Sequence, residues 1–250
     1  MEAREAPECA YDRPEFFEKY SQMSRSKYGL SGAGEWPTLK EMLPDFAGKR
    51  LLDLGCGYGW HCVYAMEHGA QSALGLELSE KMLQVAREKT PFPQVEYRQG
   101  DMEQAEFEAG SFDVVLSSLA LHYIADYDAL VRRVHRWLSP GGRFIFTCEH
   151  PVFTAQGPQD WVYGPDGQIS HFPVDNYYCE GWRKATFLGE PVTKYHRTLT
   201  HYVQGLLQGG FELLDLAEPM PPREMMDLPG MKDEMRRPMM LILSARKRAE

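Results

Sequence analysis

A glycine-rich turn stands between an apolar run and a segment of helical period. It reads Leu51-Leu52-Asp53-Leu54-Gly55-Cys56-Gly57-Tyr58-Gly59. Glycine allows the backbone to approach a ligand closely, and the start of the following helix offers free amide groups. A dinucleotide fingerprint needs Gly-x-Gly-x-x-Gly, and its last glycine would fall on Trp60. The turn favours a binding loop of another kind, although a tight turn that binds nothing can have the same glycines.

Acidic residues accompany three of the apolar runs. Asp53 precedes the glycine turn, Glu77 ends the next run 22 residues after Gly55, and Asp101 follows the third run. Strand ends of a doubly wound sheet line one crevice, where an acid can accept both hydroxyls of a ribose. Glu77 alone could be an exposed residue ahead of a helix. Three acids and a glycine turn in one unit are hard to ascribe to chance.

The elements that position these acids alternate between short apolar runs and longer helical segments, which predicts βαβ units and a parallel sheet. The expected strands cover residues 50–54, 72–78, 95–99, 112–117 and 143–148. The expected helices cover residues 60–68, 79–89 and 126–138, with Ser79 and Asp126 as the N-caps of the last two. The predicted fold class is α/β, with residues 48–149 as the cofactor-binding core.

Residues 150–197 break this alternation. They contain nine aromatic residues among 48, with proline and glycine between them and no clean period. We expect an inserted cap without regular elements, which either forms a substrate lid or packs its rings on one another. A helix over 198–208 and strands over 211–217 and 239–245 predict that residues 198–250 complete the core. Residues 1–47 are expected to form a helical segment that covers the site.

The motifs resemble those of class I S-adenosylmethionine-dependent methyltransferases that act on small molecules. The matching segments are Asp53 to Gly59, Glu77-Leu78, Asp101-Met102, Phe112-Asp113-Val114-Val115-Leu116-Ser117 and Leu138-Ser139-Pro140-Gly141-Gly142. The resemblance covers about the first 150 residues. It implies a doubly wound, seven-stranded Rossmann-like sheet in the order 3-2-1-4-5-7-6, with strand 7 antiparallel.

The same resemblance implies S-adenosyl-L-methionine as the cofactor. The residues implied to bind it are Asp53, Gly55, Cys56, Gly57, Glu77, Leu78, Asp101, Met102 and Ser117. The glycines would pass the methionine part, Glu77 would hold the ribose, and Asp101 would hold the adenine amine. N-terminal segments close the site in related enzymes, which makes Tyr20 and Arg25 further candidate contacts. An ordinary surface helix is the alternative for that segment.

Methyl transfer from a sulfonium is an in-line displacement, so the protein chiefly aligns nucleophile, methyl and sulfur in a water-poor pocket. A general base is needed only for an acceptor that arrives protonated. His122 after the fourth strand and His150 after the fifth are the candidates, with packing or capping as the alternative role for both. No pair of histidines has convincing metal-ligand spacing, so we expect no metal.

The composition narrows the class of partner. Lysine and arginine number 27 against 36 acids, and the resulting net charge of −9 opposes binding to a phosphate backbone. The first residues lack the apolar core of a signal peptide, and no window approaches the ~18–20 apolar residues of a membrane span. Five scattered cysteines without Cys-x-x-Cys favour a reduced, cytoplasmic setting. We expect a monomer or homodimer that acts on a small-molecule methyl acceptor.

The leading hypothesis is therefore a methyltransferase of a small organic acceptor, and three alternatives remain. A methyltransferase acting on RNA or DNA is opposed by the charge. It is also opposed by Ser117-Ser118-Leu119-Ala120, which stands where enzymes that methylate nucleobase amines often have Asn-Pro-Pro-Tyr. A nicotinamide-dependent oxidoreductase is opposed by Trp60, which stands where the Gly-x-Gly-x-x-Gly fingerprint needs its last glycine. A protein that binds S-adenosylmethionine without catalysis would keep all the motifs above.

Overall fold

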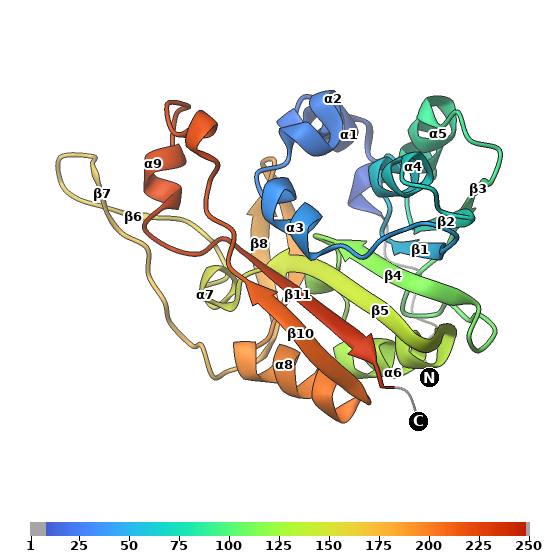
Figure 1. Ribbon diagram of the computed structural model, residues 1–250. Helices are drawn as coiled ribbons and strands as arrows, with labels where there is room; N and C mark the ends of the chain where they lie inside the picture. Colours follow the sequence, from blue (N-terminus) through green and yellow to red (C-terminus); the bar gives the residue numbers. More distant parts are fainter. Residues whose placement is uncertain (1–8, 249–250) are drawn as a thin grey trace, which may run out of the picture.

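The centre of the computed structural model, which describes residues 9–248, is one seven-stranded sheet (Figure 1). Its strands are β1 (Arg50–Leu54), β2 (Ser72–Glu77), β3 (Val95–Gln99), β4 (Phe112–Ser118), β5 (Leu138–Glu149), β10 (Phe211–Ala217) and β11 (Met240–Lys247). Their order, β10-β11-β5-β4-β1-β2-β3, is the predicted order 3-2-1-4-5-7-6 seen from the other edge. β1 to β5 are parallel, and β11 is antiparallel to β5 and β10. The predicted fold is confirmed.

Helices cover both faces of this sheet (Figure 1). They are α3 (Trp36–Met42), α4 (Trp60–Glu67), α5 (Glu80–Lys89), α6 (Tyr127–Trp137) and α8 (Leu199–Gln208). α6 and α8 bury apolar side chains in one core with Phe144 and Phe146 of β5. On the opposite face, Leu39, Cys62 and Leu83 from α3, α4 and α5 enter a second core. Both faces are therefore shielded from water, as a parallel sheet requires.

Two helices begin at the predicted side-chain caps. The Ser79 hydroxyl accepts a hydrogen bond from the N–H of Met82 at the start of α5. Asp126 accepts one from the N–H of Ala129 at the start of α6. Such caps satisfy amide groups that the first helical turn leaves free. Both N-cap predictions are confirmed.

The N-terminal segment folds into short helices. They are η1 (Ala10–Asp12), α1 (Pro14–Ser21), α2 (Ser24–Tyr28) and η2 (Gly29–Gly32). Phe16 packs against Ala185 and Val192, and Asp12 accepts a hydrogen bond from the Ser79 hydroxyl at 2.7 Å. Through these two contacts the segment is attached both to the start of α5 and to residues 150–197.

Residues 150–197 contain regular elements, which corrects the expectation of an irregular cap. α7 (Pro151–Thr154) precedes the hairpin of β6 (Val162–Tyr163) with β7 (Ile169–His171) and the hairpin of β8 (Gly181–Phe187) with β9 (Glu190–His196). Leu188 and Gly189 join β8 to β9 with φ angles of 54° and 82°, as in a two-residue hairpin turn. Leucine rarely adopts a positive φ, so this turn lacks the usual sequence signal.

The boundaries of two strands also differ from the prediction. β5 begins at Leu138 rather than Arg143, because Leu138 pairs with Phe112 before a register shift interrupts the ladder. β11 continues to Lys247, which pairs with Phe211 at the start of β10. The turn residues Ser139 to Gly142 indicated a break before the strand, but they did not predict that Leu138 pairs with Phe112 ahead of that break.

Residues 218–239, between β10 and β11, leave the sheet and form η4 (Arg223–Met225) and α9 (Met231–Glu234). We refer to them as the C-terminal insert. In Figure 1 the insert stands beyond the ends of β10 and β11, on the same side of the molecule as the β6–β7 hairpin. Over residues 9–248, helices long and apolar enough to cross a membrane are absent.

Candidate functional site

The glycine loop after β1 adopts backbone conformations that favour glycine. Gly55, Gly57 and Gly59 have φ angles of 74°, 54° and 76°. A Cβ on Gly55 would lie 2.6 Å from the Cβ of Ala120, so this glycine allows the segment after β4 to approach. A Cβ on Gly57 would meet nothing within 4 Å. The loop thus has one glycine for close packing and one that borders open space.

Glu77 ties the end of β2 to this loop. Its Oε2 accepts the N–H of Gly57 at 3.0 Å, while Oε1 accepts the N–H groups of Leu78 and Ser79 at 2.9 and 3.0 Å. Burial raises the pKa of Glu77, and these three backbone donors partly offset that rise. A carboxylate has about four acceptor sites, so Oε2 can accept one more hydrogen bond without rearrangement.

Asp53 lies fully buried beneath the loop. Its Oδ2 is 3.9 Å from Sγ of Cys62 and 3.9 Å from Nδ1 of His61, whereas Oδ1 has no hydrogen-bond partner. Burial raises the pKa of Asp53 to about 8. Native buried oxygens are almost always satisfied. An orphaned carboxyl oxygen next to the loop is therefore an unused acceptor, or a donor when protonated.

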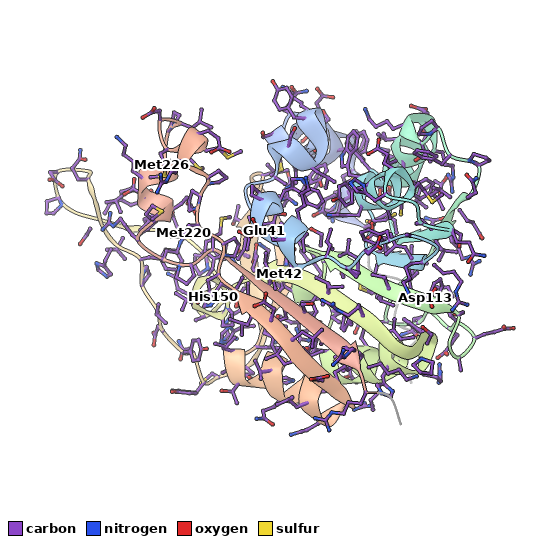
Figure 2. All side chains as sticks on the ribbon, in the orientation of Figure 1. Glu41, Met42, Asp113, His150, Met220 and Met226 are labelled. Carbon is purple, nitrogen blue, oxygen red and sulfur yellow. The ribbon has the colours of Figure 1, made fainter. Side chains whose placement is uncertain are left out.

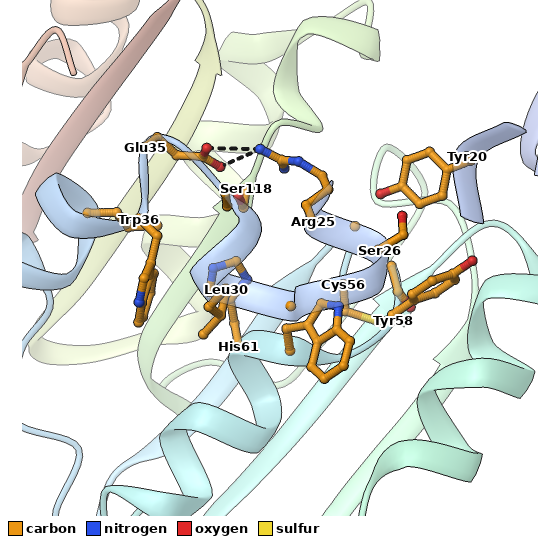
Figure 3. Close-up of a pocket in the computed structure, with 16 residues that line it drawn as sticks. Tyr20, Arg25, Ser26, Leu30, Glu35, Trp36, Cys56, Tyr58, His61 and Ser118 are labelled. Atoms are coloured by element: carbon orange, nitrogen blue, oxygen red, sulfur yellow. Dashed lines mark hydrogen bonds and ion pairs between the residues drawn. The ribbon is translucent and has the colours of Figure 1, made fainter. Parts of the chain in front are cut away.

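A pocket lies between the glycine loop and the N-terminal segment (Figure 3). The loop, the first turn of α4 and the end of β4 form one wall, and residues of α1 to α3 form the other. The pocket encloses about 70 Å³, far less than the roughly 300–1,000 Å³ typical of ligand pockets. The pocket as it stands is therefore smaller than a ligand of nucleoside size needs.

An arginine and a glutamate of the N-terminal segment meet at this pocket. Nη2 of Arg25 donates to both carboxylate oxygens of Glu35, at 2.8 and 2.9 Å, and the Glu35 side chain is only 2% exposed (Figure 3). The nearby carboxylate raises the pKa of Arg25 against the opposing effect of burial. The guanidinium has further N–H groups. It can therefore bind an anionic group in the pocket while Glu35 holds it.

Of the predicted cofactor residues, the structure brings five together in the pocket wall. They are Tyr20, Arg25, Gly55, Cys56 and Gly57. The predicted residues of β2 lie at the edge of the same loop, where Glu77 bonds to Gly57 and the Leu78 side chain is 38% exposed.

The other predicted cofactor residues lie outside the pocket lining. Asp101 follows β3, and its Oδ1 accepts the N–H of Glu103 at 2.8 Å. Met102 packs toward Gly55, where its Cε would lie 3.2 Å from an added Cβ. Ser117 is fully buried and donates its hydroxyl to the Leu54 carbonyl at 2.7 Å. Asp53 also lies outside the pocket lining, and the cofactor role of all the predicted residues stays a prediction.

The two candidate bases have their acceptor nitrogens occupied. Nδ1 of His122 accepts the N–H of Glu149 at 3.3 Å, and Nδ1 of His150 accepts that of Val152 at 3.0 Å. Burial lowers the pKa of His122 to about 4 and lowers that of His150 as well. Neither lines the pocket. Their structural roles are a buried contact and the N-cap of α7, and a base role stays a prediction.

The pocket also contains residues that sequence reasoning missed. They are Ser26, Gly29, Leu30, Ala33, Glu35, Trp36, Leu39, Tyr58, Trp60, His61 and Ser118. His61 and Ser118 had an available signal, because His61 lies in the first turn of the helix after the glycine loop and Ser118 ends β4. The N-terminal residues had none, since a short helix of ordinary composition does not show which element it will cover.

Comparisons with known proteins identify methyltransferases among the relatives of this chain. A family model described as a methyltransferase domain matches residues 52–146. The chain is 55% identical to a Listeria monocytogenes protein assigned to the S-adenosylmethionine-dependent methyltransferases. That match has a TM-score of 0.84 and covers 88% of this chain and 99% of the other.

Two further relatives match over most of their length. A Mesorhizobium loti S-adenosylmethionine-dependent methyltransferase is 43% identical, with a TM-score of 0.80 and coverage of 87% of this chain and 100% of the other. A Haemophilus influenzae protein of uncharacterized function is 34% identical over 244 residues, which is 95% of this chain and 96% of the relative. The similarity thus extends well beyond the central sheet.

Proposed function

We propose that this chain, which belongs to the S-adenosylmethionine-dependent methyltransferase family, transfers a methyl group to a small organic acceptor. The cofactor of the family is S-adenosylmethionine. One observation carries the proposal for this site. The loop of Gly55 and Gly57, held by Glu77, faces Arg25 and Tyr20 of the N-terminal segment across a pocket.

The residues present fit the cofactor. Gly57 borders open space in which a ligand can approach the backbone, and Glu77 keeps one acceptor position for a ribose hydroxyl. Arg25 would bind the cofactor carboxylate, with Glu35 holding its guanidinium in place. Asp101, which follows β3, would accept a hydrogen bond from the adenine amine. When bound, the cofactor supplies a methyl group on a positively charged sulfur, which an electron-rich acceptor atom can attack.

The protein's contribution is mainly to orient the reactants and to exclude water. Tyr20, Trp36 and Tyr58 surround the pocket with aromatic rings, which can also face a cation favourably. α1 and α2 carry Tyr20 and Arg25, so this segment would move outward to admit the cofactor and close over it afterwards. Alignment in a closed, water-poor site supplies most of the acceleration expected for an in-line displacement.

Two observations support a small acceptor. The net charge of −9 opposes binding of a nucleic acid, and the pocket is enclosed by chain segments rather than lying on a flat face. His122 and His150 could act as bases only after releasing the backbone amides that they accept. The acceptor that suits this site therefore brings its own free lone pair.

The five unbridged cysteines support a cytoplasmic setting.

The test is titration with S-adenosylhomocysteine followed by a methyl-transfer assay. At 100 times its dissociation constant the ligand should stabilise the fold by ~2.7 kcal/mol, which a thermal shift detects. Labelled S-adenosylmethionine is then offered with fractions of cell metabolites, and label should appear in a small molecule. The proposal would be contradicted if the wild type did not bind S-adenosylhomocysteine and if Glu77→Ala gave the same thermal-shift result as the wild type. Transfer to RNA with salt-sensitive binding would favour the nucleic-acid alternative.

A further inference from the structure

Both ends of the C-terminal insert lie against one residue, His150. The N–H of His150 donates to the carbonyl of Met239 at 2.9 Å, and Nε2 of His150 lies 2.8 Å from Oε1 of Glu218. His150 directly follows β5, and Figure 2 shows it below Met220 and Met226 of the insert. The insert therefore leaves and re-enters the sheet at a common anchor.

The end of the insert near Met239 is attached to the β6–β7 region by Arg236, which donates to the carbonyls of Ile169 and Ser170 of β7, and by Arg237. The guanidinium carbon of Arg237 lies 4.6 Å from the ring centroid of Phe153, 4.9 Å from that of Phe172 and 5.1 Å from that of Trp161. These three rings form a box around a cation, an arrangement that attracts positive charge strongly when water is excluded. Both terminal nitrogens of Arg237 also donate to Glu234, at 2.7 and 3.0 Å, and the residue is 9% exposed.

The insert also reaches the segment that lines the cofactor pocket. A Cβ on Gly34 would lie 3.8 Å from Cδ of Pro222, and the neighbours of Gly34, Ala33 and Glu35, belong to the pocket wall. The insert thus bridges from the N-terminal segment to the aromatic box. Two residues of the insert are apolar and exposed: Met220 is 69% exposed and Leu228 is 55% exposed. The flexible side chain of methionine can adapt its shape to an organic ligand.

We propose that the C-terminal insert is a flap on the acceptor side of the pocket, and that Arg237 in the box of Phe153, Trp161 and Phe172 latches it shut. Arg237 is then a positioning residue that acts through the flap and does not touch the reacting atoms. An acceptor enters when the guanidinium leaves the box and the neighbouring Arg236 releases the carbonyls of Ile169 and Ser170 on β7, because the insert can then swing about its ends at His150 and away from Gly34. This inference rests on the proposed function for its acceptor, but the latch itself is testable without one.

The test compares Arg237→Met and Arg237→Lys with the control Arg246→Met. Arg246 forms an exposed ion pair with Glu212 on β10 and β11, so its removal takes away an arginine but no aromatic box. The full chains are digested with trypsin in the presence of S-adenosylhomocysteine, and cleavage after Lys232 of the insert is followed. We expect cleavage about tenfold faster in Arg237→Met, an intermediate rate in Arg237→Lys and the wild-type rate in Arg246→Met.

Chemical rescue separates the box from a general loss of stability. Guanidinium at low concentration should slow the cleavage of Arg237→Met by filling the empty box, whereas sodium chloride at equal ionic strength should not. Equal cleavage of wild type and Arg237→Met would overturn the latch. Loss of S-adenosylhomocysteine binding in Arg237→Met would also overturn it, because the change would then act on the cofactor pocket.

The acceptor side is tested with the metabolite fraction that supports methyl transfer. Arg237→Met should change the amount of that fraction needed for half-maximal rate by about tenfold, with little change in the maximal rate. An unchanged requirement would overturn the role of the flap in acceptor entry. If the wild type binds S-adenosylhomocysteine but no fraction supports transfer, the proposed function fails while the protease result still decides whether the latch exists.

Discussion

The N–H of Gly57 donates to Oε2 of Glu77 at 3.0 Å, so the acid at the end of β2 holds the loop that follows β1. The two residues are 20 positions apart in the chain, and the parallel pairing of β1 with β2 brings them together. The contact makes Glu77 both a support of the glycine loop and a carboxylate at the edge of the pocket. Its removal should therefore affect binding more than an exposed glutamate would.

Glu77→Gln should weaken S-adenosylhomocysteine binding by about 10- to 150-fold, because a charge-assisted hydrogen bond is worth about 1.5–3 kcal/mol. Glu80→Gln is the matched control, since Glu80 is exposed and pairs with Arg87 on the helix surface. Calorimetric titration of both variants measures the effect. Equal affinities of the two variants would show that Glu77 does not touch the ligand.

Gly57→Ala should abolish ligand binding while costing about 1–2 kcal/mol of folding stability, the usual penalty of a left-handed conformation for alanine. Gly48→Ala is a close control, because Gly48 has a φ of 67° and its added Cβ would also meet nothing within 4 Å. Urea unfolding should give similar losses for both. Only Gly57→Ala should lose its thermal shift with S-adenosylhomocysteine, and a retained shift would place the ligand elsewhere.

Arg25→Met should lower the free energy of unfolding by about 3 kcal/mol, because it leaves the carboxylate of Glu35 buried without its partner. Arg87→Met removes an exposed ion pair with Glu80 and should change stability by no more than about 0.5 kcal/mol. Denaturant unfolding of the two variants gives the comparison. A double variant with Glu35→Gln should recover part of the loss, and failure to do so would argue against an unpaired charge as its cause.

The stability of the protein should depend on pH through Asp53. Its folded pKa is raised to about 8, whereas an unfolded aspartate titrates near 3.9. Between these values the folded state keeps a proton that the unfolded state has lost. Stability from this group therefore falls as pH rises, by about 1.4 kcal/mol for each pH unit across the window. The asparagine side chain of Asp53→Asn cannot ionise. The free energy of unfolding of this variant should therefore fall less than that of the wild type between about pH 5 and about pH 7.5, a range inside that window. If the free energy of unfolding fell equally with pH in the two proteins, the raised pKa of Asp53 would be contradicted.

Much of the fold follows from local sequence. The apolar runs predicted the central strands, and Ser79 and Asp126 predicted the starts of α5 and α6. The strand order came from the resemblance of the motifs to a known family rather than from periodicity. The turn at Leu188 and Gly189 shows where local reasoning ended, because leucine is an uncommon residue at a positive φ.

The sequence by itself determined the glycine loop and the acids at the strand ends, because spacing along a strand and helix places them at one edge of a parallel sheet. Only the tertiary structure decided what faces that edge. The alternation of side chains along β4 turns Ser117 inward to Leu54 and leaves Ser118 in the pocket wall. The packing of the N-terminal helices across the loop brings Arg25 and Glu35 to the same place. Such contacts depend on which surfaces bury one another, and no spacing within a single segment records that choice.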